Sequence, residues 1–260
     1  MKKVVLFTLL AAFAISMFAL VGCDSENTND NDTNNDLPVL KMATEATFPP
    51  YEYVENNEIV GIDAEIAGLI ANELGMKLEI VNIAFDSIVA GVETGKYDIG
   101  MACMTVTEDR LESVNFSTSY AKGVQVVIVK EESPITSVDD LFADDATYTA
   151  GTQLSTTGDI YACDDLGEDR VTSYKTGADA VAALVAGKVD CVIIDNEPAK
   201  AFVAANEGLK ILDTEYADED YAICVNKENT ELLDKINAAL AKYTADGTIQ
   251  EIIDRYIPAE

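Results

Sequence analysis

The sequence predicts an α/β protein that is divided into two similar lobes. From residue 38 onward, short β-like runs alternate with helical patterns, which is typical of mostly parallel sheets. Residues 92–100 and 184–192 repeat one pattern, in which a helix is followed by a Gly-Lys turn, an Asp and a strand. A single repeat of this kind is a common helix-to-strand turn. The two copies are about ninety residues apart, however, and this distance along the chain favours two lobes over a single sheet.

The individual elements follow from hydrophobic periodicity and from the residues that begin or end helices. Asp63 can cap the first helix, Ile66 and Ile70 lie on its apolar face, and Gly75 ends it. The expected strands are residues 40–44, 77–81, 98–102, 124–129 and 221–225. The expected helices are residues 63–74, 87–93, 138–142, 176–186, 232–243 and 249–256.

A polar set follows the strand in each copy of the repeated pattern. These sets are residues 105–110 in the first copy, and Asp195 with Asn196 in the second. Open α/β sheets bind ligands at the carboxyl ends of their strands, so we expect both sets at a cleft. Asp195 has an alternative role, because it could instead cap a helix that begins near Glu197.

Arg110 is the most informative single residue of this acidic chain. The sequence has three arginines against 47 acidic residues, and its net charge is −30. The planar fork of arginine fits a carboxylate through two parallel hydrogen bonds, and Thr105 and Thr107 add hydroxyl groups nearby. The segment therefore suits a small carboxylate. The alternative is that Arg110 pairs with Asp109 or Glu108 on a solvated face, and the segment alone leaves both open.

The amino-terminal 22 residues are expected to be a signal peptide rather than part of the fold. Two lysines precede an apolar run over residues 4–20, and Gly22 directly precedes Cys23. This ending is similar to that of a bacterial lipoprotein signal, in which Cys23 becomes the lipidated amino terminus; a plain signal peptide or a transmembrane anchor is the alternative. Residues 23–37 are expected to be a disordered tether on the outer face of the bacterial cytoplasmic membrane.

The composition excludes several functions. A pI near 4.1 argues against nucleic-acid binding, because no basic patch could release counterions. The chain has no histidine, which removes Ser-His and Cys-His catalysis and the commonest transition-metal ligand. We expect no metal and no cofactor. One disulfide is possible, but the sequence cannot pair the cysteines that remain after lipidation, namely Cys103, Cys163, Cys191 and Cys224.

Five segments together resemble the amino-acid-binding family of ABC-importer solute-binding proteins, family 3. The resemblance covers nearly all of residues 39–256. The segments that carry it, in chain order, are Thr44-Glu45-Ala46-Thr47-Phe48-Pro49-Pro50-Tyr51, Gly61-Ile62-Asp63-Ala64-Glu65-Ile66, residues 104–110, residues 153–159 with Thr156-Thr157-Gly158, and Val192-Ile193-Ile194-Asp195.

The resemblance implies a two-lobed fold of the periplasmic-binding-protein type II class, with a ligand cleft between lobes joined by two hinge strands. Lobe 1 would comprise residues 38–119 and 222–260, and lobe 2 residues 124–217. The hinges would be residues 120–123 and 218–221. The ligand-binding residues that it implies are Glu45, Phe48, Phe85, Cys103, Thr105, Arg110, Gln153, Thr156, Thr157 and Asp195.

The implied roles divide a zwitterionic ligand between the lobes. Arg110 would hold the α-carboxylate, assisted by backbone N–H groups of Thr105 and Thr157. Asp195 would hold the α-ammonium group, aided by the Thr105 hydroxyl and the Cys103 carbonyl.

The remaining implied residues would surround the ligand side chain. Phe48 and Phe85 would form apolar walls, although without the resemblance they are interpreted as ordinary core aromatics. Glu45 would contact the ligand side chain and determine which side chains bind. Gln153 and Thr156 would line the second lobe.

The implied function is that of an extracytoplasmic receptor that delivers a free L-amino acid to an ABC importer and performs no chemistry. Its partners would be the ligand and the permease, with a membrane contact through the lipid anchor only, and it would act as a monomer. The expected ligand is polar, with Lys, Arg and Gln ahead of cystine. The alternative is a cyclohexadienyl-dehydratase-like enzyme acting on a cyclic carboxylic acid, for which Glu45 is the candidate acid or base.

Overall fold

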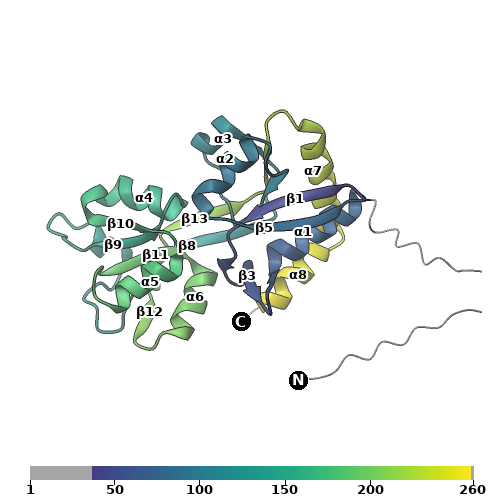
Figure 1. Cartoon of the computed structure of the whole chain (residues 1–260). Helices are drawn as coiled ribbons and strands as arrows, with labels where there is room; N and C mark the ends of the chain where they lie inside the picture. Colours follow the sequence, from purple (N-terminus) through teal and green to yellow (C-terminus); the bar gives the residue numbers. More distant parts are fainter. Residues whose placement is uncertain (1–36, 259–260) are drawn as a thin grey trace, which may run out of the picture. The chain divides into compact units, whose positions relative to one another are not determined.

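The computed structural model describes residues 37–258 of the chain (Figure 1). The predicted signal peptide, the lipidation site Cys23 and the tether up to residue 36 lie outside the described residues. Within the described part, no helix combines the length and the apolar character that a membrane span would need.

The first sheet has five strands and begins at the amino-terminal end of the described chain. Its strand β1 runs parallel to β5 on one side and to β6 on the other, while β14 pairs antiparallel with β6 and β7. From one edge to the other, the strands are β5 (Lys77–Asn82), β1 (Val39–Thr44), β6 (Ile99–Gly100), β14 (Cys224–Asn226) and β7 (Val114–Phe116).

A second sheet contains the strands of the other lobe. Strands β9, β10 and β11 run parallel, whereas β8 is antiparallel to β11, β12 and β13. Its strands are β10 (Val171–Tyr174), β9 (Ala150–Gln153), β11 (Cys191–Asp195), β8 (Ala121–Lys130), β12 (Leu209–Ile211) and β13 (Ala217–Tyr221). A small third sheet consists of β2 (Thr47–Phe48), β3 (Glu52–Glu55) and β4 (Glu58–Val60).

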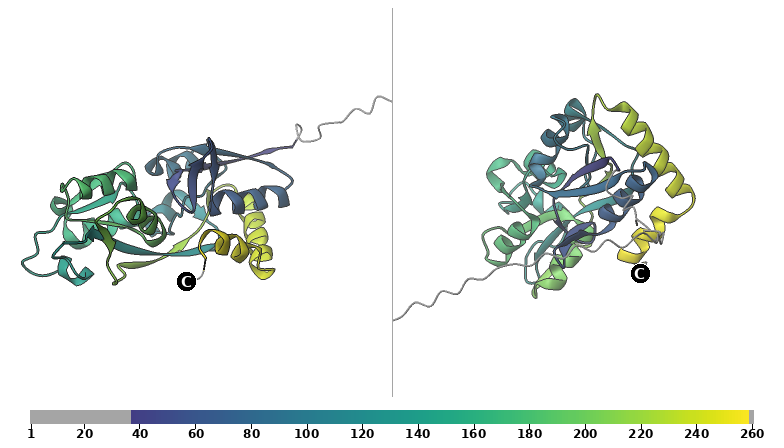
Figure 2. Two further views of the ribbon diagram at one scale, coloured as in Figure 1. Left: turned by 90° about the horizontal axis from the view of Figure 1, so that it is seen from below. Right: turned by 45° about the vertical axis from the view of Figure 1, so that its right-hand side comes forward.

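The helices pack against these sheets. Helices α1, α7 and α8 contact one another, as the views in Figures 1 and 2 also show. The α-helices are α1 (Ile62–Glu73), α2 (Ile88–Glu93), α3 (Glu108–Ser113), α4 (Thr157–Leu166), α5 (Gly177–Val185), α6 (Asn196–Ala205), α7 (Thr230–Ala245) and α8 (Thr248–Tyr256). Short 3-10 helices cover Phe85–Ser87, Val138–Leu141 and Glu168–Arg170.

Helix α1 shows how the apolar pattern builds the core. Ile62, Ile66 and Ile70 recur at helical spacing, and each is at most 1% exposed in a cluster that also contains Leu40 and Met42 of β1. Each such side chain contributes about 1.5–3 kcal/mol when it is fully buried.

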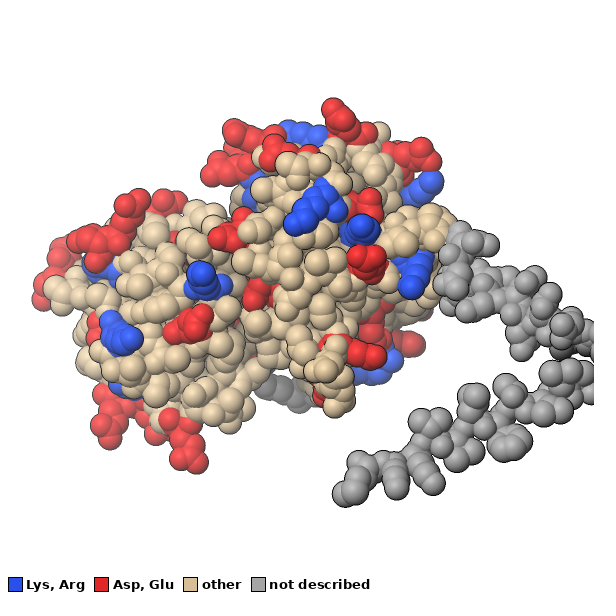
Figure 3. Space-filling view, viewed as in Figure 1, with Lys and Arg blue, Asp and Glu red and all other residues tan. Residues whose placement is uncertain are grey.

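The surface, by contrast, is strongly acidic, and Figure 3 shows Asp and Glu side chains at many places on one face.

The prediction that Asp63 caps the first helix is wrong. The N-cap residue is Gly61, and the backbone N–H groups of Ile62 and Asp63 donate to the carbonyls of Pro50 and Tyr51 at 3.2 and 3.0 Å. Because backbone carbonyls satisfy this helix start, the Asp63 side chain is free to point inward, where it is fully buried.

Two predicted strands also differ from the structure. Residues 98–102 contain only the two-residue strand Ile99–Gly100. Residues 221–225 are not one strand: β13 ends at Tyr221, Ala222 N–H donates to the Met104 carbonyl, and β14 begins at Cys224. The chain leaves the second sheet and joins the first at this point, which a sequence pattern does not show.

The four cysteines of the described chain are free thiols. Cys191 and Cys224 lie in strands, and Cys163 lies in α4. Cys103 lies in a loop and has a φ of 46°.

Two glycines near the same helix should respond oppositely to substitution by alanine. Gly61 has a φ of 123°, and a Cβ there would overlap the Tyr51 carbonyl oxygen, whereas a Cβ at Gly68 in α1 meets nothing within 4 Å. We expect Gly61→Ala to lower the free energy of unfolding by about 2 kcal/mol or more. Gly68→Ala, the matched control, should raise it by about 0.5–1 kcal/mol. Urea unfolding measures both, and equal effects would contradict this account of the helix start.

Candidate ligand-binding site

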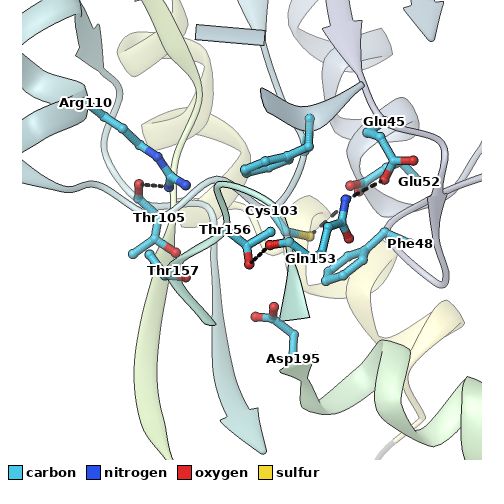
Figure 4. Close-up of a pocket in the computed structure, with 12 residues that line it drawn as sticks. Glu45, Phe48, Glu52, Cys103, Thr105, Arg110, Gln153, Thr156, Thr157 and Asp195 are labelled. Carbon is cyan, nitrogen blue, oxygen red and sulfur yellow. Dashed lines mark hydrogen bonds between the residues drawn. The ribbon is translucent and has the colours of Figure 1, made fainter. Parts of the chain in front are cut away.

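A pocket gathers side chains from strands of the second and third sheets, from helices α3 and α4, and from the segments that follow β1 and β6. All ten residues predicted to bind the ligand line it, together with two that the sequence analysis did not select, Glu52 and Ala102. Figure 4 shows Arg110 and Thr105 on one side of the pocket, Glu45 and Glu52 on the other, and Asp195 away from both groups.

Arg110 reaches the pocket from α3. Thr107 is the N-cap residue of this helix, and its hydroxyl accepts the Arg110 backbone N–H at 3.2 Å. The guanidinium donates to the carbonyl of Thr105 at 2.7 Å and to that of Ser155 at 2.9 Å, and its central carbon lies 5.4 Å from the centre of the Phe85 ring.

These contacts exclude the alternative in which Arg110 pairs with Asp109 or Glu108. Arg110 is 9% exposed, and no ion pair involves it within the part of the chain that the structure describes. Burial lowers the pKa of its guanidinium, and the nearby carboxyl of Glu219 opposes this effect. Arginine stays charged in proteins, so the pocket contains a cation whose neighbours are mainly dipoles.

Asp195 ends β11 and occupies the N-cap position of α6, but its side chain makes no capping hydrogen bond. The capping alternative is therefore wrong for the side chain. Its carboxyl instead accepts hydrogen bonds from the Gln125 amide at 2.9 Å and from the Tyr221 hydroxyl. Burial is the main cause that raises the pKa of Asp195 to about 7, so an arriving cation would stabilise its ionised form.

Glu45 and Gln153 join the two lobes across the pocket. The Glu45 carboxyl accepts from the Thr47 hydroxyl at 2.7 Å and from the Gln153 amide at 3.2 Å. The Gln153 side-chain oxygen accepts the Gly177 backbone N–H at 3.1 Å. Burial raises the pKa of Glu45, although both hydrogen bonds act in the opposite direction. Phe48 is 7% exposed and belongs to the main core as well as to the pocket wall.

Thr156 and Thr157 stand at the start of α4. The Thr156 hydroxyl accepts the Asp159 backbone N–H at 3.2 Å and donates to the Gln153 carbonyl at 2.8 Å. Thr157 is the first residue of the helix, where backbone N–H groups suit an anionic group.

Cys103 is held beside the pocket by two acids that the sequence analysis did not assign to the site. Its backbone N–H donates to Asp63 at 3.2 Å, and its thiol lies 3.7 Å from a Glu52 oxygen. Among the described residues, Glu52, Asp63 and Cys103 are the group whose atoms lie close enough to hold a metal, all within 4.8 Å. Burial raises the pKa of the Glu52 and Asp63 carboxyl groups and of the Cys103 thiol, which favours their protonated forms.

Glu219 of β13 lies behind Thr105 and was also missed. Its carboxyl accepts a hydrogen bond from the Thr105 hydroxyl. Burial raises the pKa of Glu219, although Thr105, Thr157 and Arg110 each act to lower it. The sequence did contain a signal for it. Glu219 and Tyr221 are two residues apart in a strand, so they share a face, and both are buried.

The site therefore has one cation and several buried carboxyl groups at separate positions. Such an arrangement suits a small molecule that carries one carboxylate and at least one cationic group, because each charge would meet its opposite in a dry environment. The fold and this pocket define a two-lobed α/β binding protein for a small charged solute.

Comparison with known proteins agrees with this class. The chain belongs to the bacterial extracellular solute-binding proteins, family 3, whose family model matches residues 40–259. The resemblance predicted from the sequence is thus confirmed, as is the two-lobed α/β fold class.

Individual relatives extend the comparison. The chain is 32% identical to ABC transporter arginine-binding protein 1 of Escherichia coli (strain K12), over 99% of this chain and 100% of that protein. An ancestral arginine-binding protein bound to arginine is similar in structure, with a TM-score of 0.76 and 37% identity over 84% of this chain and 97% of that one. The structure of an ancestral arginine-binding protein bound to glutamine gives a TM-score of 0.78 and 36% identity, over 85% and 98% of the respective chains.

The raised pKa of Asp195 predicts a pH-dependent stability for the ligand-free protein. Between the ordinary aspartate pKa of 3.8 and the folded pKa of about 7, the folded state binds more protons than the unfolded state, so stability falls as pH rises. We expect Asp195→Asn to remove a part of this fall between pH 5 and 8, on the order of 1–4 kcal/mol.

Urea unfolding at the two pH values measures the effect. Asp218→Asn, on the exposed side of β13, is the matched control and should keep the dependence of the unsubstituted protein. If the free energy of unfolding of Asp195→Asn depended on pH as strongly as that of the unsubstituted protein, the raised pKa of a buried Asp195 carboxyl without an opposite charge would be contradicted.

Proposed function

We propose that this protein is an extracytoplasmic receptor that binds a free L-amino acid in the pocket and delivers it to an ABC importer. The observation that carries the proposal is the placement of Arg110 and Asp195 in one pocket, both buried and at separate positions. Arg110 takes the α-carboxylate of the ligand, and Asp195 takes its α-ammonium group.

The physical basis is the cost of removing a zwitterion from water. That cost is large unless both charges meet matched partners. Hydrogen bonds to charged groups contribute about 1.5–3 kcal/mol each, and a dry pocket strengthens them. Because Arg110 and Asp195 come from elements of different lobes, a ligand that binds both stabilises the closed arrangement of the lobes.

We propose that the ligand carries a cationic side chain, with an amide side chain as the second candidate. Glu45 and Glu52 face the pocket opposite Arg110, which supports a guanidinium or ammonium group at that end. The arginine-binding relatives support the same class. Glutamine is the second candidate because a related structure has it bound, and because Gln153 and Glu45 offer amide and carboxyl partners.

We further propose that the protein performs no chemistry. Glu45 remains the candidate acid or base for a dehydratase, but it is hydrogen-bonded to Thr47 and Gln153. A substrate without an α-ammonium group would leave Asp195 buried and unmatched, which is costly. We propose that it also acts as a monomer.

The lobe boundaries and hinges are proposed as in the sequence analysis, with residues 120–123 and 218–221 as the crossings. Their support is the pairing of β8 with β13 and the hydrogen bond from Tyr120 N–H to the Tyr221 carbonyl, at 2.9 Å. This pairing joins the two crossings where the chain passes between the sheets.

Calorimetric titration of the protein from Asp24 onward against the common L-amino acids tests the proposal. We expect tight one-to-one binding of cationic amino acids, and a loss of affinity on the order of a hundredfold or more in Arg110→Lys, because lysine cannot form the bidentate contact. Arg255→Lys, an exposed change in α8, is the matched control and should bind normally. Binding of none of the amino acids would contradict the proposed function.

We propose that a lipid on Cys23 anchors the protein to the outer face of the bacterial cytoplasmic membrane. The support is the sequence Leu20-Val21-Gly22-Cys23 before a polar tract. In cells, Cys23→Ser should move the protein from the membrane fraction to the soluble fraction. Retention of the variant in the membrane fraction after carbonate washing would contradict a lipid anchor and favour a transmembrane one.

A further inference from the structure

Two buried carboxyl groups stand together at the side-chain end of the pocket. Glu52 comes from β3 and is 1% exposed, and Asp63 comes from α1 and is 0% exposed. Glu52 lines the pocket beside Glu45 (Figure 4), whereas Asp63 lies behind it, against Cys103.

Within the described chain, the hydrogen bonds of Asp63 leave one of its two carboxyl oxygens without a donor. One Asp63 oxygen accepts the Cys103 backbone N–H at 3.2 Å and the Tyr120 hydroxyl at 2.9 Å. The other oxygen has no N–H or O–H donor among the described residues. A carboxyl oxygen of Glu52 and one of Asp63 lie within 4.8 Å of each other. A proton on one of the two carboxyl groups removes the repulsion between them.

No neighbouring cation relieves this pair. The titratable groups that face it are acidic or weakly acidic, and no lysine or arginine of the described chain forms an ion pair with either carboxyl. These neighbours are Glu45, Tyr51, Cys103, Tyr120 and, farther away, Asp195.

Two buried carboxyl groups in contact cannot both be ionised at moderate pH. Burial, with Asp63 and Glu45 adding to it, raises the pKa of Glu52 well above its usual range. Burial raises the pKa of Asp63 to about 7. At moderate pH the pair therefore does not carry two negative charges, and the protonated form of Glu52 is favoured.

We propose that Glu52 sets the charge selectivity of the pocket through the proton of its carboxyl group, which a cationic ligand side chain displaces and a neutral side chain does not. The inference rests on the proposed function, since it concerns the same ligand. In the exchange, the O–H bond of Glu52 breaks, the proton passes to solvent, and the resulting carboxylate pairs with the ligand cation. One positive charge replaces another, so the net charge buried at this end of the pocket is unchanged.

The exchange makes selectivity depend on pH. As pH falls, the proton competes better with the cationic side chain, so arginine loses affinity relative to glutamine. Asp195 also releases protons when it binds an α-ammonium group, but every amino acid ligand shares that effect. The ratio of the two affinities therefore isolates the side-chain end.

Calorimetric titrations with arginine and glutamine, each in two buffers of different ionisation enthalpy, count the protons released between pH 6 and 8. We expect the protein to release up to about one proton more on binding arginine than on binding glutamine. The ratio of the arginine affinity to the glutamine affinity should increase by up to tenfold for each unit that the pH rises. Glu52→Gln should abolish both differences. The amide keeps a hydrogen-bond donor near Asp63, but it has no acidic proton to release and cannot become negatively charged. Glu55→Gln, an exposed change in the same strand, is the matched control and should behave as the unsubstituted protein.

Each other outcome has a defined meaning. Equal proton release for arginine and glutamine would overturn the inference while leaving the proposed function intact. A difference that persists in Glu52→Gln and disappears in Glu45→Gln would also overturn it, because the proton would then belong to Glu45. Binding of neither ligand would contradict the proposed function and this inference together. If Glu52→Gln fails to fold, Asp63→Asn replaces it. Loss of the neighbouring carboxylate weakens the hold of Glu52 on its proton, so the extra proton release with arginine should decrease, and an unchanged release would overturn the inference.

Discussion

The structure depends on buried ionisable groups whose hydrogen-bond partners are dipoles rather than opposite charges. Arg110 contacts two backbone carbonyls, and Asp195 contacts an amide and a phenol hydroxyl. Burying a charge without an opposite charge is expensive, so these groups gain the most when a ligand supplies the missing charge. The start of α3, the end of β11 and the buried face of β13 all serve to hold these groups in place.

The same groups connect the pocket to the passage between the two sheets. Tyr221, whose hydroxyl donates to Asp195, ends β13, and its ring lies so close to Gly123 of β8 that a Cβ there would overlap the Tyr221 hydroxyl. Asp63 likewise joins Cys103 at the pocket to Tyr120 at the proposed first hinge. These contacts link the pocket to residues next to the proposed crossings, which is where hinge closure would need a coupling.

The sequence predicted the side chains of the pocket better than the buried acids behind it. Arg110, Thr105 and Asp195 were predictable because polar residues follow apolar strands at the edge where ligands bind. Asp63 was assigned to a helix cap, since sequence does not show that the carbonyls of Pro50 and Tyr51 already satisfy that helix start. Glu52 resembles a surface acid in an acidic chain, and only the packing of distant strands shows that it is buried.

The most direct test of this account is the titration of Asp195 followed by carboxyl-carbon NMR, with its signal assigned by its absence in Asp195→Asn. The account predicts a pKa near 7 in the ligand-free protein, which falls by at least one unit when arginine binds, because the α-ammonium group stabilises the carboxylate. A pKa near 4 in the ligand-free protein, unchanged by the ligand, would show that the carboxyl is already matched and would contradict the central claim.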